Sequence, residues 1–463
     1  MTKKWILLII VMWLMGVQLF AAEKTVRTLT PQEAVADLDS MVALIEQVHP
    51  NPYAHLKKKT LNKAVKASRQ RLQLQSVSAT ELYLELARIA ALFGEGHLLI
   101  TPKSIFSSNM RPFRIASCVS VDVRNGRMTL DCDTVIDGVA LRKGDEIVKI
   151  GGKNTRKIVK ELLHYISGEK NFFKYEHLPH ESSTRAWLNL RLKEGGLNEL
   201  DVKTSQGVKH IRVLPKKKVA TQSTTAQSQK SWSWEMLNDT VMLLHFDQCD
   251  WDGFKEFAAD MFAHLRTQKI PYFIIDNREN GGGISYASDE ICRYIAHEPF
   301  TWLNKVVMRS SEPQRSFYRN YHKEESDSAL LEMLDECLSM PDTIISYVET
   351  DYVEPYPDSL RYEGKVYLLN SHTTFSSASS LAGEFKHYRM GITVGEETGG
   401  MNISSGEIIA VTLPHSGFSL WIPTKIFYMV GYDENSPVHG ILPDVAVPQK
   451  DALAKALQLI GKQ

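Results

Sequence analysis

The length and composition of the chain are those of an ordinary globular protein. Its 463 residues suggest about two to four domains, and with 43% hydrophobic and 23% charged residues a mainly disordered chain is excluded. Lysine and arginine together number 54, as do aspartate and glutamate, so the net charge is zero. Because no overall basic charge attracts nucleic acid or anionic lipid, neither is expected as a partner.

The first 22 residues follow the order of a secretory signal peptide. Lys3 and Lys4 make a basic start, Trp5–Phe20 is uncharged and mostly apolar, and Ala21 and Ala22 offer a cleavage site. The alternative is an uncleaved membrane anchor, although the apolar run is shorter than the ~20 residues of a spanning helix. We therefore expect an exported protein, periplasmic or secreted, with no stable membrane span after signal cleavage.

Residues 23–113 are predicted to form a helical segment. Thr30 is a candidate N-cap with a proline in the first turn, and further helices are expected over Leu61–Leu72 and Ala79–Leu92. The last helix stops at the segment Gly94–His97.

Residues 114–215 have the pattern of a β-rich domain. An Asn125-Gly126 turn would pair residue 118 with 133 and 119 with 132. This register places Cys118 and Cys132 on opposite faces, which disfavours a disulfide between them. Two more strands are predicted at 187–192 and 208–214.

Neither the cysteines nor the histidines form a metal-binding pattern. Five scattered cysteines are a poor disulfide framework, and at least one must stay unpaired. No CxxC, HExxH or Cys/His cluster is present. A structural zinc site is therefore not expected. The reaction predicted below needs no metal and no cofactor.

Residues 216–233 have the composition of a linker, and residues 234–463 alternate between strands and helices. The expected strands cover 241–246, 272–276, 366–369 and 392–394, and the expected helices cover 254–268 and 377–389. This alternation predicts a sheet covered on its faces, with ligand sites at the strand ends. Residues 298–362, with a short helix at Ser328–Cys337, are either a lid or a decoration.

Ser376 lies between a predicted buried strand and a predicted helix. A serine there has its oxygen near free backbone N–H groups, which could also bind a developing oxyanion. The alternative is an ordinary N-cap serine. The Asn280–Gly283 turn also follows a buried strand, and its glycines either let a substrate approach the backbone closely or form a flexible loop.

Together these segments resemble the C-terminal processing, or tail-specific, serine peptidase family S41. Residues 276–283 are similar to its "D-L-R-x-N-x-G-G" segment, with Asn277 in place of leucine, and residues 374–378 to its "T-x-S-A" nucleophile segment. Residues 395–400 are similar to "G-E-x-T-x-G", and residues 440–445 to "G-[IV]-x-P-D". Residues 141–153 resemble a stretch of the PDZ domain that the family inserts before its catalytic core. The motifs occur in the family's order.

The resemblance implies a fold of the α/β class, α+β overall. Its parts would be an N-terminal helical segment with the base at 23–113, a PDZ-like β-rich domain at 114–215, and an α/β catalytic core of the ClpP/crotonase type at 234–463. It also implies a serine endopeptidase with Ser376 as nucleophile. The backbone N–H groups of Gly282 and Ser377 would hold the oxyanion, with Gly281 as the alternative to Gly282.

The base is predicted from a departure within the family. Met401 stands where the bacterial processing branch has a lysine, so the resemblance favours the tricorn-core-like branch, whose histidine precedes the PDZ insertion. His97 occupies that place, preceded by Gly96 instead of serine. An ordinary histidine base predicts activity rising through roughly pH 6 to 7.

A glutamate is expected to complete the site. Glu434 is our choice, and Glu396 and Glu397 are competitors. The family's acidic residue three positions after the nucleophile is Ser379 here. Substrates would be polypeptides, with C-terminal tails a candidate ligand of the PDZ-like domain. The alternatives are a non-catalytic peptide-binding member of the family and a serine esterase or binder of small apolar ligands.

Overall fold

The structure is a computed structural model, and it divides into two compact units. One unit comprises residues 225–408 and 423–463 and is called the core unit; the other comprises residues 19–224 and 409–422 and is called the N-terminal unit. The residues that the structure describes are 28–102, 121–122, 126–130, 132–178, 182–193, 199–212, 231–322 and 328–461. The predicted signal peptide and most of the predicted linker lie outside these residues.

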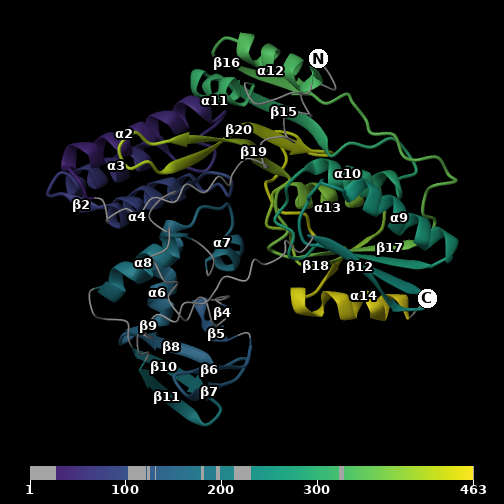
Figure 1. Cartoon of the computed structure of the whole chain (residues 1–463), viewed down its shortest axis with the longest axis horizontal. Coiled ribbons are helices and arrows are strands. Elements are labelled where there is room, and N and C mark those ends of the chain that lie inside the picture. The colour runs from purple at the N-terminus through teal and green to yellow at the C-terminus, as the bar shows by residue number, and fades with distance from the viewer. Residues whose placement is uncertain are drawn as a thin grey trace. The chain divides into compact units, whose positions relative to one another are not determined.

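A six-stranded sheet organises the core unit (Figure 1). Its order is β12-β13-β14-β17-β18-β21, parallel throughout except for the antiparallel pair β12–β13. The strands are β12 (Trp232–Asn238), β13 (Val241–Phe246), β14 (Tyr272–Asp276), β17 (Lys365–Asn370), β18 (Ile392–Gly395) and β21 (Val445–Ala446). The strands predicted from apolar runs are confirmed, because strands buried on both faces need apolar side chains on both.

Helices cover both faces of this sheet. Along β13, Met242 and Leu244 pack with α9, α10 and α13, whereas Val241 and Leu243 pack with α14. Figure 1 shows the same division, with α14 alone on one side. The helices are α9 (Phe254–Thr267), α10 (Ser285–Arg293), α13 (Ser377–His387) and α14 (Ala452–Ile460), the last preceded by the 3-10 turn η4 (Gln449–Asp451). The predicted α/β class is thus confirmed.

The described part of residues 298–362 is not one long loop, because regular elements occur between Leu303 and Val348. These elements are two strands and two helices: β15 (Leu303–Ser310), α11 (Glu312–His322), α12 (Ser328–Ser339) and β16 (Thr343–Val348). β15 pairs antiparallel with both β16 and β20 (Ser419–Met429), in a sheet whose order is β16-β15-β20-β19. β19 covers Ile403–Thr412. The short helix predicted at 328–337 is confirmed.

The N-terminal unit begins with the predicted helices. Thr30 caps α2 (Pro31–Val48) in a capping box with Glu33, and Ser78 caps α4 (Ala79–Ala90) in the same way. Between them lies α3 (Lys58–Leu72), and the 3-10 turn η1 (Ala91–Phe93) follows α4. Short strands complete this part: β1 (Thr28–Leu29), β2 (Val77–Ser78) and β3 (Leu99–Thr101).

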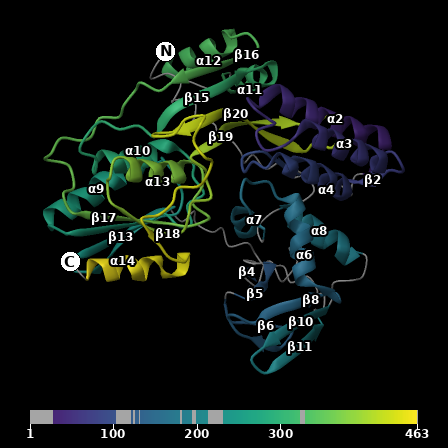
Figure 2. The ribbon, with the colours of Figure 1, turned by 180° about the vertical axis from the view of Figure 1, so that it is seen from behind.

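The second part of the N-terminal unit is a small sheet with helices. The sheet order is β11-β10-β8-β5-β4, and Figure 2 shows α6 and α8 beside it. The elements of this part of the chain are β4 (Val121–Asp122), β5 (Met128–Leu130), β6 (Thr134–Ile136), β7 (Val139–Leu141), β8 (Glu146–Ile150), β9 (Lys153–Asn154), α6 (Thr155–Leu162), η3 (Leu163–Tyr165), α7 (Asn171–His177), α8 (Ser182–Lys193), β10 (Glu199–Thr204) and β11 (Gly207–Arg212). The strands β6 and β7 pair only with each other. That this part is a PDZ-like domain stays a prediction.

The predicted hairpin register is the one observed. Val121 pairs with Leu130 and Asp122 with Thr129, which continues the pairing predicted for residues 118 and 119. Cys118 itself lies outside the described residues. The other four cysteines are free thiols: Cys132, Cys249, Cys292 and Cys337.

The strand predicted at 187–192 is wrong, because this segment belongs to helix α8. Its alternating leucines also fit a helix, since six residues are too few to separate a period of 2 from one of 3.6. The packing of the segment favours the helix, because Ala186 and Trp187 are buried and the Trp187 indole donates to Glu161 Oε1 over 2.8 Å.

Candidate active site

Ser376 has a strained backbone at the start of α13. Its φ is +54° and its ψ is −130°, a region that residues with a Cβ atom rarely adopt. Its side chain makes no capping hydrogen bond to the described first turn of the helix, so the ordinary N-cap interpretation does not hold. Ser376 therefore lies in a sharp strand-to-helix turn without using its hydroxyl to cap the helix.

Two glycines make room for this turn. A Cβ atom at Gly282 would lie 2.7 Å from Ser376 Cβ and 2.8 Å from the Phe375 carbonyl oxygen, and Gly282 has a φ of +97°. A Cβ atom at Gly400 would lie 3.0 Å from Ser376 N and would collide with Ser379 Oγ. Both positions therefore need glycine. Gly282 needs it for its backbone conformation and for space, and Gly400 needs it for space alone.

Hydrogen bonds join the nucleophile turn, which is the turn between β17 and α13 that carries Ser376, to the turn after β14. Phe375 N donates to the Asn280 carbonyl over 3.0 Å, and Ser377 Oγ donates to the Gly283 carbonyl over 2.8 Å. Thr374 Oγ1 donates to the Asn277 carbonyl over 2.8 Å. The structure thus brings together the 276–283 and 374–378 segments, which are far apart in sequence.

The three predicted oxyanion donors differ in their present bonding. Gly282 N–H donates to Asn280 Oδ1 over 2.9 Å, inside its own turn. Ser377 is the first residue of α13, where N–H groups have no acceptor within the helix. Neither Ser377 N–H nor Gly281 N–H makes a hydrogen bond to the part of the chain that the structure describes. Within the described residues, the N–H groups of Ser377 and Gly281 are therefore available to an acceptor, whereas that of Gly282 is already used.

His97 belongs to the N-terminal unit, and its surroundings are defined there. It follows Gly94, which ends η1 in the left-handed conformation with φ +71°. Only 8% of the His97 surface is exposed. Burial lowers the pKa of His97 to about 4, against a smaller opposing effect of the Glu95 charge. The imidazole is therefore neutral at pH 7, the form in which a histidine accepts a proton.

Residues from two other segments hold the His97 loop. The Glu95 carboxylate lies 2.7 Å from His49 Nε2, at the end of α2. Ser167 Oγ donates to the Glu95 carbonyl over 2.6 Å, and Gly96 N–H lies 3.2 and 3.3 Å from the two carboxylate oxygens of Glu169. Sequence reasoning missed Ser167 and Glu169, because they follow the loop by more than 70 residues and match no motif.

The predicted glutamates have different surroundings. Glu434 is largely exposed, with Oε2 3.2 Å from Lys305 Nζ, and its pKa is lowered by its own backbone N–H and then by Lys305. Glu397 Oε1 accepts the Gly440 N–H over 2.8 Å. Glu396 Oε2 lies 3.9 Å from Nε2 of His372, a histidine in the nucleophile turn that sequence reasoning did not consider. The choice of Glu434 remains a prediction.

Two departures from the family pattern have structural roles. Met401 is buried, and its backbone bridges to Gly440. Ser379 is also buried, and its hydroxyl donates to the Thr374 carbonyl over 2.9 Å. Ser379 therefore supports the nucleophile turn, although it supplies no charge.

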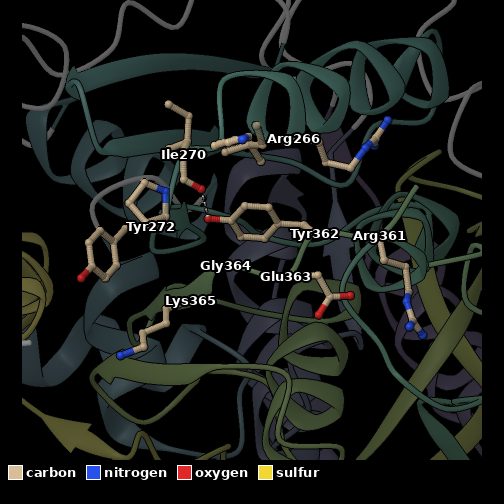
Figure 3. A pocket seen from close by; sticks show the side chains of 11 residues that line it. Arg266, Ile270, Tyr272, Arg361, Tyr362, Glu363, Gly364 and Lys365 are labelled. Carbon is tan, nitrogen blue, oxygen red and sulfur yellow. Dashed lines mark hydrogen bonds between the residues drawn. The ribbon is translucent and has the colours of Figure 1, made fainter. Parts of the chain in front are cut away.

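A cavity of about 520 Å³ lies at the end of the core sheet where β14 and β17 begin (Figure 3). It is lined by residues where β14 and β17 begin, whereas Ser376 follows the end of β17. Figure 3 shows Arg266, Arg361 and Lys365 pointing in different directions, so they do not converge on one ligand. We do not assign this cavity to the active site.

The described residues contain neither a helix that could span a membrane nor a cluster that could hold a metal ion. None of their helices combines the length and apolar composition needed to cross a bilayer. None of their histidine, cysteine, aspartate and glutamate side chains form a group of three or more that could hold a metal ion.

Comparisons with known proteins show the fold and a similarity to one peptidase family. Residues 241–447 match the family model described as "Peptidase family S41". The crystal structure of mature CPAF aligns with a TM-score of 0.62 at 15% identity, covering 93% of this chain and 95% of that one. The structure of mature CPAF complexed with lactacystin aligns with a TM-score of 0.61 at 14% identity. This alignment covers 93% of this chain and 97% of that one. No curated protein sequence matches the chain.

The family match covers the elements that build the nucleophile turn. It begins at Val241, the first residue of β13, and ends one residue after β21. Ser376, Gly282 and Gly400 all lie within it. At 14–15% identity the solved structures show a common fold. Residues 241–447 are similar to peptidase family S41, and this similarity supports a serine peptidase.

Proposed function

We propose that the protein is an exported serine endopeptidase in which Ser376 attacks the scissile peptide bond and His97 is the general base. Glu434 would complete the site. The observation that carries the proposal is the backbone of Ser376, whose φ of +54° is maintained where Gly282 and Gly400 leave room for it. Strain of this kind costs about 1–3 kcal/mol and persists where function requires it.

The chemistry follows from the groups present. Ser376 Oγ bonds to the carbonyl carbon while its proton passes to the neutral His97 imidazole. The negative charge on the carbonyl oxygen is held by the N–H groups of Ser377 and Gly281, with Gly282 N–H joining if it leaves Asn280 Oδ1. His97 then protonates the departing amine, and water releases the acyl group from Ser376.

Substrate binding and export form the outer parts of the proposal. The small sheet of the N-terminal unit ends in the strands β4 and β11. A polypeptide, including a free C-terminal tail, could add a strand to such an edge, as in PDZ domains. Export rests on the order of basic, apolar and small residues in the first 22 positions.

The proposal is tested by covalent labelling with a fluorophosphonate, which reacts with activated serines. Wild-type protein should be labelled, and Ser376→Ala should lose labelling, while Ser377→Ala and Ser379→Ala should retain some. His97→Ala should reduce labelling at least 100-fold, because general-base catalysis contributes about 10²–10⁴.

His372→Ala is the matched control for the base. It removes a histidine of the nucleophile turn itself, and it should leave the labelling rate within a few-fold of wild type. Equal labelling of Ser376→Ala and wild type would overturn the nucleophile. A loss confined to His372→Ala would overturn His97 as the base, and an unlabelled wild type would favour a non-catalytic protein.

A further inference from the structure

Glu169 contacts the His97 loop at Gly96, the residue immediately before His97. It precedes α7, and its two carboxylate oxygens lie 3.2 and 3.3 Å from the N–H of Gly96, next to His97 in the chain. The neighbouring Ser167 exchanges two hydrogen bonds with the backbone of Glu95, of 2.6 and 3.3 Å. The segment 167–169 therefore holds both residues that precede His97.

The contact with Glu169 is made by the backbone of Gly96, because glycine has no side chain that could donate or accept a hydrogen bond. The Glu169 carboxylate reaches that backbone from another segment. An ionised carboxylate is a stronger acceptor than a neutral carboxyl group, so the strength of this contact depends on the charge of Glu169.

We propose that Glu169 is a positioning residue for His97, whose ionised carboxylate fixes the loop Gly94–His97 through the Gly96 N–H. This inference rests on the proposed function, because it assigns Glu169 a role in presenting the base. Protonation of Glu169 weakens its hold on Gly96, so the loop orders His97 less well and the reaction of Ser376 slows.

Burial brings the pKa of Glu169 close to neutrality. Burial raises the pKa of Glu169 to about 7, and the Glu95 charge adds to this, while its own backbone N–H, Gly96 N–H and Lys174 of α7 oppose it. His49 faces the same cluster through its contact with Glu95. Because His97 is already neutral well below this pH, a rise in activity near pH 7 would report Glu169 and not the base.

The test compares pH profiles of fluorophosphonate labelling in the full-length protein. Wild type should react about tenfold faster at pH 8 than at pH 6, as the ionised fraction of a group titrating near 7 increases about tenfold over that range. Glu169→Gln keeps an oxygen acceptor but cannot ionise, so its rate should change less than twofold. Glu199→Gln, an exposed glutamate on β10, is the matched control and should keep the wild-type profile.

A second measurement does not depend on activity. The Gly96 amide resonance should shift with a midpoint near pH 7 in wild type and in Glu199→Gln, and should not shift in Glu169→Gln. A Gly96 amide that fails to titrate in wild type, or a labelling midpoint near 7 that survives in Glu169→Gln, would overturn the role of Glu169. A titrating Gly96 amide in a protein that no fluorophosphonate labels would overturn the proposed function while supporting the contact.

Discussion

Gly282 and Ser376 lie so close that a single methyl group on Gly282 would fall 2.7 Å from Ser376 Cβ. The two residues are on different turns, one after β14 and one after β17, and parallel pairing of these strands places both turns at the same edge of the sheet. The strained turn that presents Ser376 is therefore shaped by a partner almost a hundred residues earlier in the sequence.

Gly282→Ala should destabilise the protein and abolish labelling of Ser376. The alanine would meet both the steric conflict and a φ of +97°, and we expect a loss of about 2–4 kcal/mol in the free energy of unfolding. Gly281→Ala is the control, because a Cβ atom there has no neighbour within 4 Å. Urea denaturation of both variants decides the matter; equal stabilities would contradict the assigned contact.

Ser376→Gly should be more stable than Ser376→Ala by about 1–2 kcal/mol, although neither can be labelled. Glycine adopts the observed backbone angles without strain, whereas alanine does not. At Ser377, the first residue of α13, the order should reverse, with glycine less stable than alanine by about 0.5–1 kcal/mol. Thermal or urea unfolding of the four variants measures both differences. The same order at both positions would argue against strain at Ser376.

The stability conferred by neutral His97 should be lost on acidification. Because burial lowers the pKa of His97 to about 4, the unfolded chain binds a proton between pH 6.5 and 4 that the folded protein does not. His97→Asn removes this proton uptake. The stability of wild type relative to His97→Asn should therefore fall by roughly 2 kcal/mol from pH 7 to pH 4.5.

The control for this titration is His164→Asn, which replaces an exposed histidine of η3. It should leave the pH dependence of unfolding close to that of wild type. Selectively labelled histidine can also be followed by NMR, and an imidazole of His97 that titrates near 6.5 would contradict the burial argument. In that case the activity should rise between about pH 6 and 7, as expected of an ordinary histidine base.

Much of the local structure could be predicted from the sequence. The capping signals at Thr30 and Ser78 lie next to the helices they start, and β14 and β17 are continuous apolar runs. These features depend on neighbours within a few residues, so the pattern alone carries the information. The strand prediction for residues 187–192 was wrong because a short alternation of apolar residues fits both a strand and a helix. Only the packing of this segment distinguishes the two.

Local sequence patterns identified most of the helices and strands, the order of the motifs and the residues around Ser376. The tertiary structure alone decided the conformation of Ser376, the lowered pKa of His97 and the contact between Glu169 and Gly96. Each of these arises from groups far apart in the chain: a glycine that makes room, burial that excludes water, and a carboxylate from another segment. No local pattern records such approaches, because distance in space is set by the packing of whole elements.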